Sequence, residues 1–514
     1  MSKTIIIIGA GLAGLSAALQ AAENGCNVKL VSFLPSERAQ SVMAEGGINA
    51  ALNTKDENDS PEEHFTDTIK AACGLADPNA VWGMTQAAPE LVHWLLKLGV
   101  KFNMSGYDDV DLRNFGGQKK KRTAFAQSDT GKQIMTAMID AVRRKEASGM
   151  VERFSHHSFL TLRLCGNICC GCVIRDEYSQ ETVELPGDAV IVATGGMHGL
   201  FGNTTGSLSN TGEVTAELFR LGVLLANGEM IQYHPTTVKC GGKRMLISEA
   251  ARGEGGRLFA MKDGKQWYFM EEKYPELGNL MPRDITAREI WKVSHESEVF
   301  LDMTEISEEI ISNKLSGLAD DCMTYLHKDI RKEPVSVLPG IHYFMGGILV
   351  DEQHRTPIQN LYAAGECCAQ YHGANRLGGN SLLGALYGGR VAAKSACEQA
   401  DVVDLSCATQ IDFPPASQIS EIKQLNKVMQ ETMGVVRNEN TLLNGIQTVQ
   451  ALTGNLPLLG MAVLKSALAR KESRGAHWRE DYPKSNDDDY LKTTVARFDG
   501  KQIQISFVPV PERR

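Results

Sequence analysis

The N-terminal segment TIIIIGAGLAGL constrains the fold of this chain more than any other stretch of its sequence. Four consecutive isoleucines predict a short strand buried on both faces, as in a parallel sheet. Glycines at GxGxxG spacing follow at Gly9, Gly11 and Gly14, and an Ala/Leu-rich helix runs to about Glu23. A second apolar run, NVKLVSF, completes a βαβ unit whose glycines allow a tight turn, a close approach to phosphate and helix–strand packing. These features favour a folded start over a cleaved signal peptide.

Two later apolar runs also predict buried strands. DAVIVATGG (188–196) ends on a glycine pair, and NLYAAGE (360–366) ends on Gly-Glu. Open α/β sheets bind cofactors at such carboxyl ends of strands. The second strand of the βαβ unit, however, ends in Ser32-Phe33, whereas NAD-binding proteins carry an acid there for the ribose hydroxyls. NAD is therefore not the first choice of cofactor.

Length and charge narrow the class of protein. A chain of 514 residues predicts two or three structural units. The net charge of −9 argues against a nucleic-acid binder, whose footprint is usually basic. We find no uncharged apolar stretch of about 20 residues, so we expect no membrane span. Twelve cysteines without a secretory signal favour reduced thiols in the cytosol.

Two short segments have competing interpretations. CGNICCGC holds four cysteines, but their spacing fits no zinc or ferredoxin pattern, so a hairpin turning at Gly166-Asn167 is favoured over a metal site. The four are Cys165, Cys169, Cys170 and Cys172. KKKR (119–122) predicts a solvated basic face, with docking of a partner as the minority alternative.

Helical patterns cover about Pro61–Gly74, Pro78–Leu98 and Gly131–Lys145, and resume near Ile419–Thr432 and Leu456–Lys471 after a predicted linker at Cys397–Ser417. Between these two groups of helical segments, the hydrophobic pattern is irregular from about residue 231 to residue 339, which favours an inserted domain. We predict an α/β fold with three parts: a discontinuous Rossmann-like domain (1–230 plus 340–398), an inserted α+β capping domain (231–339) and a helical C-terminal domain with a short tail (415–514).

Several polar residues recur in Gly- and Pro-bounded segments of the inserted region and its borders: His234, Ser248, Glu249, Arg252, Arg283, His342 and Arg376. Arginine offers a bidentate fork to a carboxylate, and histidine adds a charge-assisted donor. The set suits a small substrate with more than one carboxylate. For the segment SEAARGEGG (248–256), the competing interpretation is a solvated loop.

The longer motifs are similar to those of one family. In chain order they are IIIIGAGLAGLSAA, MAEGGINAA, NFGGQKKKRTAFAQSDTG, IVATGG, QYHPTT, LISEAARGEGG, MPRDITARE, HYFMGGI, LYAAGE, HGANRLGGNSL and ALARKESRGAHWREDYP. Together they resemble the flavoprotein subunit of the fumarate reductase/succinate dehydrogenase family, from Thr4 to about Thr494. L-aspartate oxidase, a relative with the same architecture, shares most of them.

The resemblance implies bound FAD, a mobile cap over residues 231–339 and an active site between cap and flavin. His234, Ser248, His342 and Arg376 would hold the two carboxylates of a C4 dicarboxylate, and Phe115 would wall the pocket. Arg283 would donate the proton in fumarate reduction, and Glu249 and Arg252 would form a proton path to it. The implied FAD-binding residues are Gly9, Gly11, Gly14, Ser32, Ser41, Gly46, Gly47, Ala193, Thr194, Gly195, Glu366, Arg376, Ser381 and Leu382.

Three positions depart from the family pattern. Gln40 stands where covalently flavinylated relatives carry the linking His, so the resemblance implies a dissociable FAD, a lower flavin potential and a bias toward fumarate reduction. Ser248 keeps the hydroxyl of the usual Thr. Glu213 replaces the Asp of a TGDG run, which leaves the backbone role of that segment open.

The favoured function is that of a fumarate reductase flavoprotein subunit. L-aspartate oxidase is the nearest alternative, since it also lacks the linking His, and a catalytically silent flavin-bearing subunit is a further one. Because we find no haem or cluster motif in the chain, we expect electrons to come from an iron–sulfur subunit or another donor. We expect a cytoplasmic protein that meets a membrane only through partners, binds no nucleic acid and holds no metal.

Overall fold

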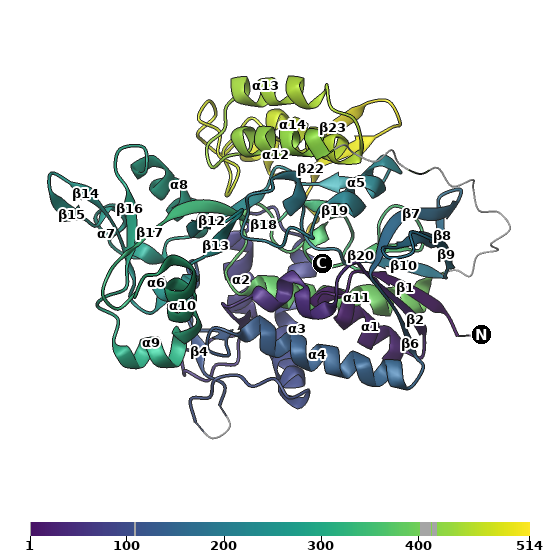
Figure 1. Cartoon of the computed structure of the whole chain (residues 1–514), viewed down its shortest axis with the longest axis horizontal. Coiled ribbons are helices and arrows are strands. Elements are labelled where there is room, and N and C mark those ends of the chain that lie inside the picture. Colours follow the sequence, from purple (N-terminus) through teal and green to yellow (C-terminus); the bar gives the residue numbers. More distant parts are fainter. Residues whose placement is uncertain (1, 107–108, 401–412, 414–418) are drawn as a thin grey trace.

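The computed structural model describes residues 2–106, 109–400, 413 and 419–514. A five-stranded parallel sheet lies toward the right of Figure 1, with helices packed beside and beneath it. Its strands, in spatial order, are β20 (Leu361–Ala363), β10 (Ala189–Val192), β1 (Thr4–Ile8), β2 (Asn27–Ser32) and β6 (Val151–Ser155). The four strands predicted from TIIII, NVKLVSF, DAVIVATGG and NLYAAGE are thus confirmed as β1, β2, β10 and β20, as is the α/β class.

Side-chain alternation along β1 divides the core. Ile5 and Ile7 pack with the helices on one face, whereas Ile6 and Ile8 pack against a second sheet on the other. The helices are α1 (Leu12–Glu23), α4 (Thr130–Ala147) and α11 (Asn380–Gln399). The second sheet consists of β7 (His157–Cys165), β8 (Ile168–Asp176) and β9 (Thr182–Pro186). Both faces of β1 are therefore buried, which is why its sequence is uniformly apolar.

The predicted helices near residues 61 and 78 form where their caps indicate. The Ser60 hydroxyl accepts from the Glu63 N–H at the start of α2 (Pro61–Ala71), and Asp77 caps α3 (Pro78–Lys97) in the same way. A small sheet lies beside them: β3 (Ile48–Asn49), β5 (Thr123–Ala124) and β4 (Leu112–Arg113).

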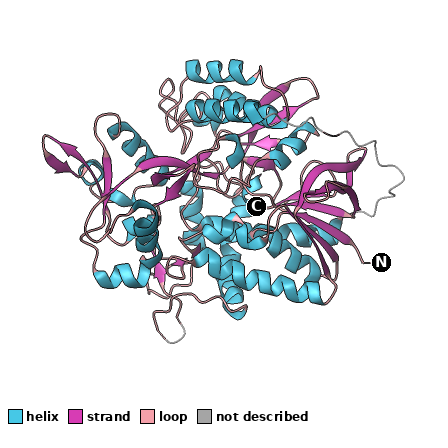
Figure 2. Cartoon of the chain, in the orientation of Figure 1, coloured by secondary structure: helices cyan, strands magenta, loops and turns pink. Residues whose placement is uncertain are grey.

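Residues 231–339 form two antiparallel sheets and several short helices, at the left of Figures 1 and 2. One sheet is β13 (Lys243–Leu246), β12 (Ile231–Cys240) and β18 (Leu338–Phe344); the other is β15 (Lys265–Trp267), β14 (Arg257–Lys262), β16 (Val299–Asp302) and β17 (Val335–Ser336). The helices are α6 (Glu249–Gly253), α7 (Phe269–Lys273), α8 (Arg283–Val293), α9 (Glu308–Lys314) and α10 (Ser316–Asp321). Apart from Phe115, the buried residues of their core lie between Ile247 and Val337. The predicted domain boundaries stay a prediction.

The C-terminal region contains more than helices. The predicted helices are confirmed as α12 (Ile419–Thr432) and α14 (Asn455–Ala469), with α13 (Glu439–Val449) between them. The chain then forms a hairpin, β22 (Lys492–Phe498) and β23 (Ile503–Pro509), where only a short tail was expected. β22 pairs with β11 (Leu225–Ala226), which joins it to β19 (Gly347–Leu349) and β21 (Cys368–Ala369). Two further α-helices of the described residues are α5 (Glu213–Arg220) and α15 (Asp487–Tyr490).

Two local expectations have different outcomes. The cysteine-rich segment is a hairpin, with Cys165 paired to Ile168 across the predicted turn. Ten cysteines of the described residues are free thiols, but Cys165 is disulfide-bonded, so the expectation of reduced thiols is wrong at this position. KKKR is not wholly solvated, because Arg122 is fully buried and pairs with Asp59 and Asp67 at 2.8 and 3.0 Å. Two carboxylates from the preceding segment compensate its charge, and no pattern within KKKR reveals this.

The predicted linker at Cys397–Ser417 lies mostly outside the described residues, and its first part continues α11 to Gln399. Within the residues described, no helix is long and apolar enough to cross a bilayer. Nor do three or more His, Cys, Asp or Glu side chains gather there as a metal site.

Candidate active site

A cavity of about 850 Å³ runs from the carboxyl ends of β1, β2, β10 and β20 to the β12–β18 sheet and α8. At its inner end, Gly9 has φ +110°, and a Cβ there would lie 2.3 Å from the Ala193 carbonyl oxygen. Only glycine allows this close approach of β1 to β10. Gly14 serves a different purpose, because a Cβ there would meet the Gly9 carbonyl oxygen at 1.8 Å. It permits α1 to pack on the strand and does not line the cavity.

Polar groups at this end suit a nucleotide. The Ser32 hydroxyl oxygen is buried without a hydrogen-bond partner among the described residues and lies at the carboxyl end of β2. The Leu12 N–H, in the first turn of α1, points to the Ser41 hydroxyl at 3.2 Å. A helix N-terminus, a glycine turn and an unpaired hydroxyl are groups that a dinucleotide's phosphates and sugars engage. The residues present therefore fit FAD.

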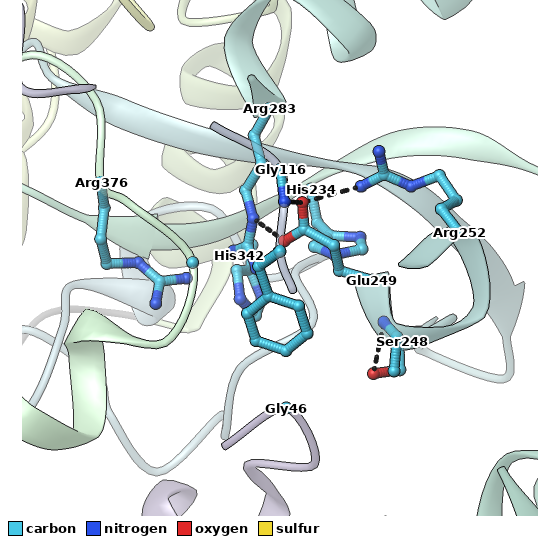
Figure 3. A network of polar contacts seen from close by, with 12 residues as sticks. Gly46, Gly116, His234, Ser248, Glu249, Arg252, Arg283, His342 and Arg376 are labelled. Carbon is cyan, nitrogen blue, oxygen red and sulfur yellow. Dashed lines mark hydrogen bonds and ion pairs between the residues drawn. The ribbon is translucent and has the colours of Figure 1, made fainter. Parts of the chain in front are cut away.

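At the other end of the cavity, Glu249 lies between two guanidinium groups (Figure 3). Its Oε2 accepts from Arg283 Nε at 2.7 Å and lies 2.5 Å from Nη2 of the same residue. Its Oε1 lies 3.3 Å from Arg252 Nη2 and accepts from the Gly116 N–H at 3.2 Å. The carboxylate is buried, and so is Arg252, whose Nη1 donates to the Asn279 carbonyl oxygen at 2.6 Å. SEAARGEGG is therefore not a solvated loop at these positions.

Arg283 faces a second arginine across the cavity. It is the first residue of α8, so the positive end of the helix dipole lies at the same place. Arg283 Nη1 and Arg376 Nε both donate to Gln232 Oε1, at 3.1 and 3.2 Å. The Arg376 guanidinium also lies 4.4 Å from the centre of the Tyr343 ring. Since β12 and β18 pair Gln232 with Tyr343, one position in the sheet supports both arginines.

Two histidines lie beside the arginines on the same wall of the cavity. The rings of His234 and His342, from β12 and β18, lie 5.1 Å apart edge to face. His342 Nδ1 contacts the Thr205 hydroxyl at 2.8 Å, whereas His234 Nε2 is buried without a partner among the described residues. Because buried polar atoms are normally hydrogen-bonded, a buried nitrogen that faces a cavity without a protein partner is expected to contact a bound ligand.

Burial and mutual repulsion set the protonation of this wall. Burial lowers the pKa of both His234 and His342 well below the ordinary value, and the nearby Arg283 charge lowers it further. Burial and Arg283 also lower the pKa of Arg376 to about 9. Burial opposes ionisation of Glu249, but Arg283 and Arg252 outweigh it, so the pKa of this carboxyl lies below its ordinary value. The site thus holds neutral imidazoles beside an ion-paired carboxylate, and the charges of Arg283 and Arg376 suit it to an anion.

Most residues expected at the site line this cavity. All the expected cofactor-binding residues except Gly14 do so, as does Gln40. Phe115, His234, Ser248, Glu249, Arg283, His342 and Arg376 line it as well. Arg252 does not, and lies behind Glu249. Ser248 also caps α6, because its hydroxyl accepts from the Ala250 N–H at 3.4 Å. Phe115 lies against Gly46, where a Cβ would meet the ring at 2.9 Å.

Sequence reasoning missed Gln232 and Tyr343. Both belong to motifs that it singled out, QYHPTT and HYFMGGI, but a neutral amide and a phenol carry no charge signal. Their importance depends on the pairing of β12 with β18, which the chain order does not reveal. Glu254, in the same segment as Glu249, pairs with Lys314 at 3.0 Å and does not line the cavity.

Comparisons with known proteins agree with this geometry. A model of the FAD binding domain matches residues 4–382, and a model of the fumarate reductase flavoprotein C-terminal region matches residues 452–513. The chain is 38% identical to the succinate dehydrogenase flavoprotein subunit of Bacillus subtilis, over 100% of this chain and 98% of the relative. It is 32% identical to the 8-methylmenaquinol:fumarate reductase flavoprotein subunit of Wolinella succinogenes, over 100% and 92%.

It is also 31% identical to the L-aspartate oxidase of Streptomyces coelicolor, over 100% of this chain and 94% of the relative. Among solved structures, a point mutant of FrdA from E. coli quinol fumarate reductase superposes with a TM-score of 0.90 at 27% identity, covering 99% of this chain and 97% of that one. The chain therefore belongs to the FAD-dependent flavoprotein family of succinate dehydrogenases and fumarate reductases.

Proposed function

We propose that this chain is the flavoprotein subunit of a fumarate reductase and reduces fumarate to succinate with noncovalently held FAD. The observation that carries the proposal is the buried Glu249, held between Arg283 at the cavity and Arg252 behind it. A proton donor beside the substrate needs a group that replaces its proton, and this arrangement supplies one. A silent scaffold has no need of it.

The clamp for the substrate consists of His234, Ser248, His342 and Arg376, with Phe115 as one wall. These residues would bind the two carboxylates of fumarate, polarise its double bond and exclude water. Binding of a dianion would draw protons onto the neutral histidines. Reduced FAD, when bound, supplies the hydride for one alkene carbon.

Arg283 would give a proton to the other carbon. Arginine in water is a poor acid, because its pKa lies far above neutral. Here Arg376 and Arg252 add positive charge nearby, and Glu249 Oε2 accepts directly from Arg283 Nε. Glu249 is ionised, so it would take a proton from Arg252 and pass one to Arg283 as the substrate takes one, and Arg252 would draw its replacement from solvent.

The reductive direction rests on Gln40. An amide cannot form the histidyl–flavin bond, so FAD would stay dissociable and its potential lower than in covalently flavinylated relatives. Succinate oxidation would be weak. Electrons would come from an iron–sulfur or other donor subunit, and we place the assembly in the cytoplasm, with any membrane contact made through partners.

Anaerobic visible spectroscopy of the FAD-loaded protein tests the proposal. L-aspartate should leave the oxidised flavin spectrum unchanged, and succinate should bleach it weakly or not at all. After chemical reduction, added fumarate should restore the oxidised spectrum rapidly. Bleaching by L-aspartate would instead identify an L-aspartate oxidase. Complete bleaching by succinate would identify a succinate dehydrogenase, and a flavin that stays reduced with fumarate would refute the proposal.

A further inference from the structure

A buried histidine lies behind the cavity, outside the catalytic set. His198 follows β10 at the start of a short 3₁₀ helix (His198–Leu200) and is fully buried. Its Nε2 lies 3.7 Å from Oε1 of Glu366, which follows β20 and lines the cavity. Because β10 and β20 are parallel neighbours, their carboxyl ends bring the two residues together.

The contacts of His198 indicate which nitrogen carries the proton. Nδ1 lies 3.0 Å from the Thr204 hydroxyl, which also accepts from the Gly206 N–H at 3.2 Å. Nε2 has no hydrogen-bond partner among the described residues and faces a carboxylate oxygen. A bare lone pair there would be repelled by Glu366, whereas an N–H would be attracted. The favoured arrangement has Thr204 donating to Nδ1 and the proton on Nε2.

The His198 ring has little freedom to leave this position. It packs edge to face on Phe344 with the ring centres 5.0 Å apart, and a Cβ at Gly206 would overlap it at 2.1 Å. Phe344 also donates its backbone N–H to Glu366 Oε1 at 3.1 Å. A Cβ at Gly196 would lie 2.7 Å from the same oxygen. Glu366 Oε1 thus accepts from a backbone donor and lies against a glycine surface, with the imidazole nearby as an electrostatic partner.

We propose that His198 is a positioning residue for FAD: its Nε2–H, 3.7 Å from Oε1, attracts the Glu366 carboxylate and favours the orientation that it presents to the FAD cavity. The inference rests on the FAD binding that the proposed function also needs, but not on the substrate. Without His198, the Glu366 carboxylate would keep the Phe344 N–H but lose the attraction that favours one orientation, and FAD affinity would fall because the bound orientation would have to be selected more often from others.

Fluorescence titration of the FAD-free protein with FAD tests the proposal. We expect His198→Leu to raise the Kd at least about 10-fold and His198→Gln, which keeps an N–H donor, to stay within about 3-fold of the wild type. Thr204→Val, a near-isosteric change, removes the donor to Nδ1 and should weaken FAD by an intermediate factor. The Thr204→Val variant tests the proposal if the His198→Leu protein does not fold.

A double-mutant cycle separates positioning from general structural support. In a Glu366→Gln background, His198→Leu should cost little further affinity, because the carboxylate that it positions is gone. An equal loss in both backgrounds, or a His198→Leu protein with wild-type affinity, would overturn the proposal. The titration contains no substrate. Its result therefore tests the role of His198 even if the protein binds FAD but does not reduce fumarate.

Discussion

Arg283 and Arg376 share one acceptor, because both donate to Oε1 of Gln232, at 3.1 and 3.2 Å. The same amide donates from Nε2 to the Asn375 side chain and to the Arg376 carbonyl oxygen, at 3.0 and 2.9 Å. A neutral side chain thus holds two like charges at a set separation. It does so without the negative charge that would compete with an anionic substrate.

Gln232→Leu should therefore lower kcat/KM for fumarate by about 10- to 100-fold, because both guanidinium groups lose their alignment. Gln232→Glu should raise KM chiefly, because it adds a negative charge where a dianion must bind. Steady-state kinetics with a chemically reduced dye as donor would measure both. Unchanged kinetics in Gln232→Leu would show that the arginines are held by other contacts.

Glu249→Gln should reduce kcat by about 10²-fold or more while FAD binding persists, because the proton path to Arg283 is cut. Glu254→Gln is the matched control from the same segment. Its carboxylate pairs with Lys314 and does not line the cavity, so kcat should stay within about 2-fold of wild type. Equal losses in the two variants would argue against a specific path through Glu249.

Gln40→His restores the residue type that links flavin in covalently flavinylated relatives, at a position that lines the cavity. We expect flavin fluorescence to remain with the denatured polypeptide on a gel, whereas the wild type should release its FAD on denaturation. Succinate oxidation should rise relative to fumarate reduction. Flavin retained by the denatured wild-type protein would contradict the noncovalent assignment.

Glu45 should make stability depend on pH. Burial and the nearby Asp321 raise the pKa of its carboxyl to about 8, against the opposing effects of Arg113 and Ser248. Between about pH 4.5 and 8 the unfolded chain loses this proton and the folded chain keeps it, so folding stability falls as pH rises, by at most about 1.4 kcal/mol per pH unit. Glu45→Gln removes this loss. In urea unfolding it should match wild type near pH 4.5 and be more stable at pH 8; a constant difference would exclude the effect.

Arg122→Met should destabilise the fold by about 3–5 kcal/mol, because it leaves Asp59 and Asp67 buried without their cation. The triple variant Asp59→Asn, Arg122→Met, Asp67→Asn should recover most of this loss. Lys121→Met, at an exposed neighbouring position, should change stability by no more than about 0.5 kcal/mol. Urea unfolding of the FAD-loaded proteins compares them. A triple variant as unstable as Arg122→Met would refute the role assigned to the ion pairs.

Local patterns in the sequence were enough to predict the strand–glycine–helix start, the helices capped at Ser60 and Asp77, and the cysteine-rich hairpin. Each depends on neighbours within a few residues, such as an isoleucine run, a glycine that accepts positive φ or a side chain that caps its own helix. The long motifs also sufficed to indicate the family, because their order along the chain is itself information. The cavity-lining positions of most expected site residues follow from those motifs.

Only the tertiary structure decided which charges meet. Glu249 lies between Arg252 on its own helix and Arg283 on another, and the pairing of β12 with β18 puts Gln232 beside Tyr343. Arg122 is buried because two acids from an earlier segment reach it, and the C-terminal hairpin joins a sheet with β11, far away in sequence. These outcomes depend on long-range pairing and on burial. Burial changes the free energy of a charged side chain, and the residue type alone does not reveal whether that side chain is buried. The sequence determined which chemical groups were available; the folded chain determined which of them are desolvated together.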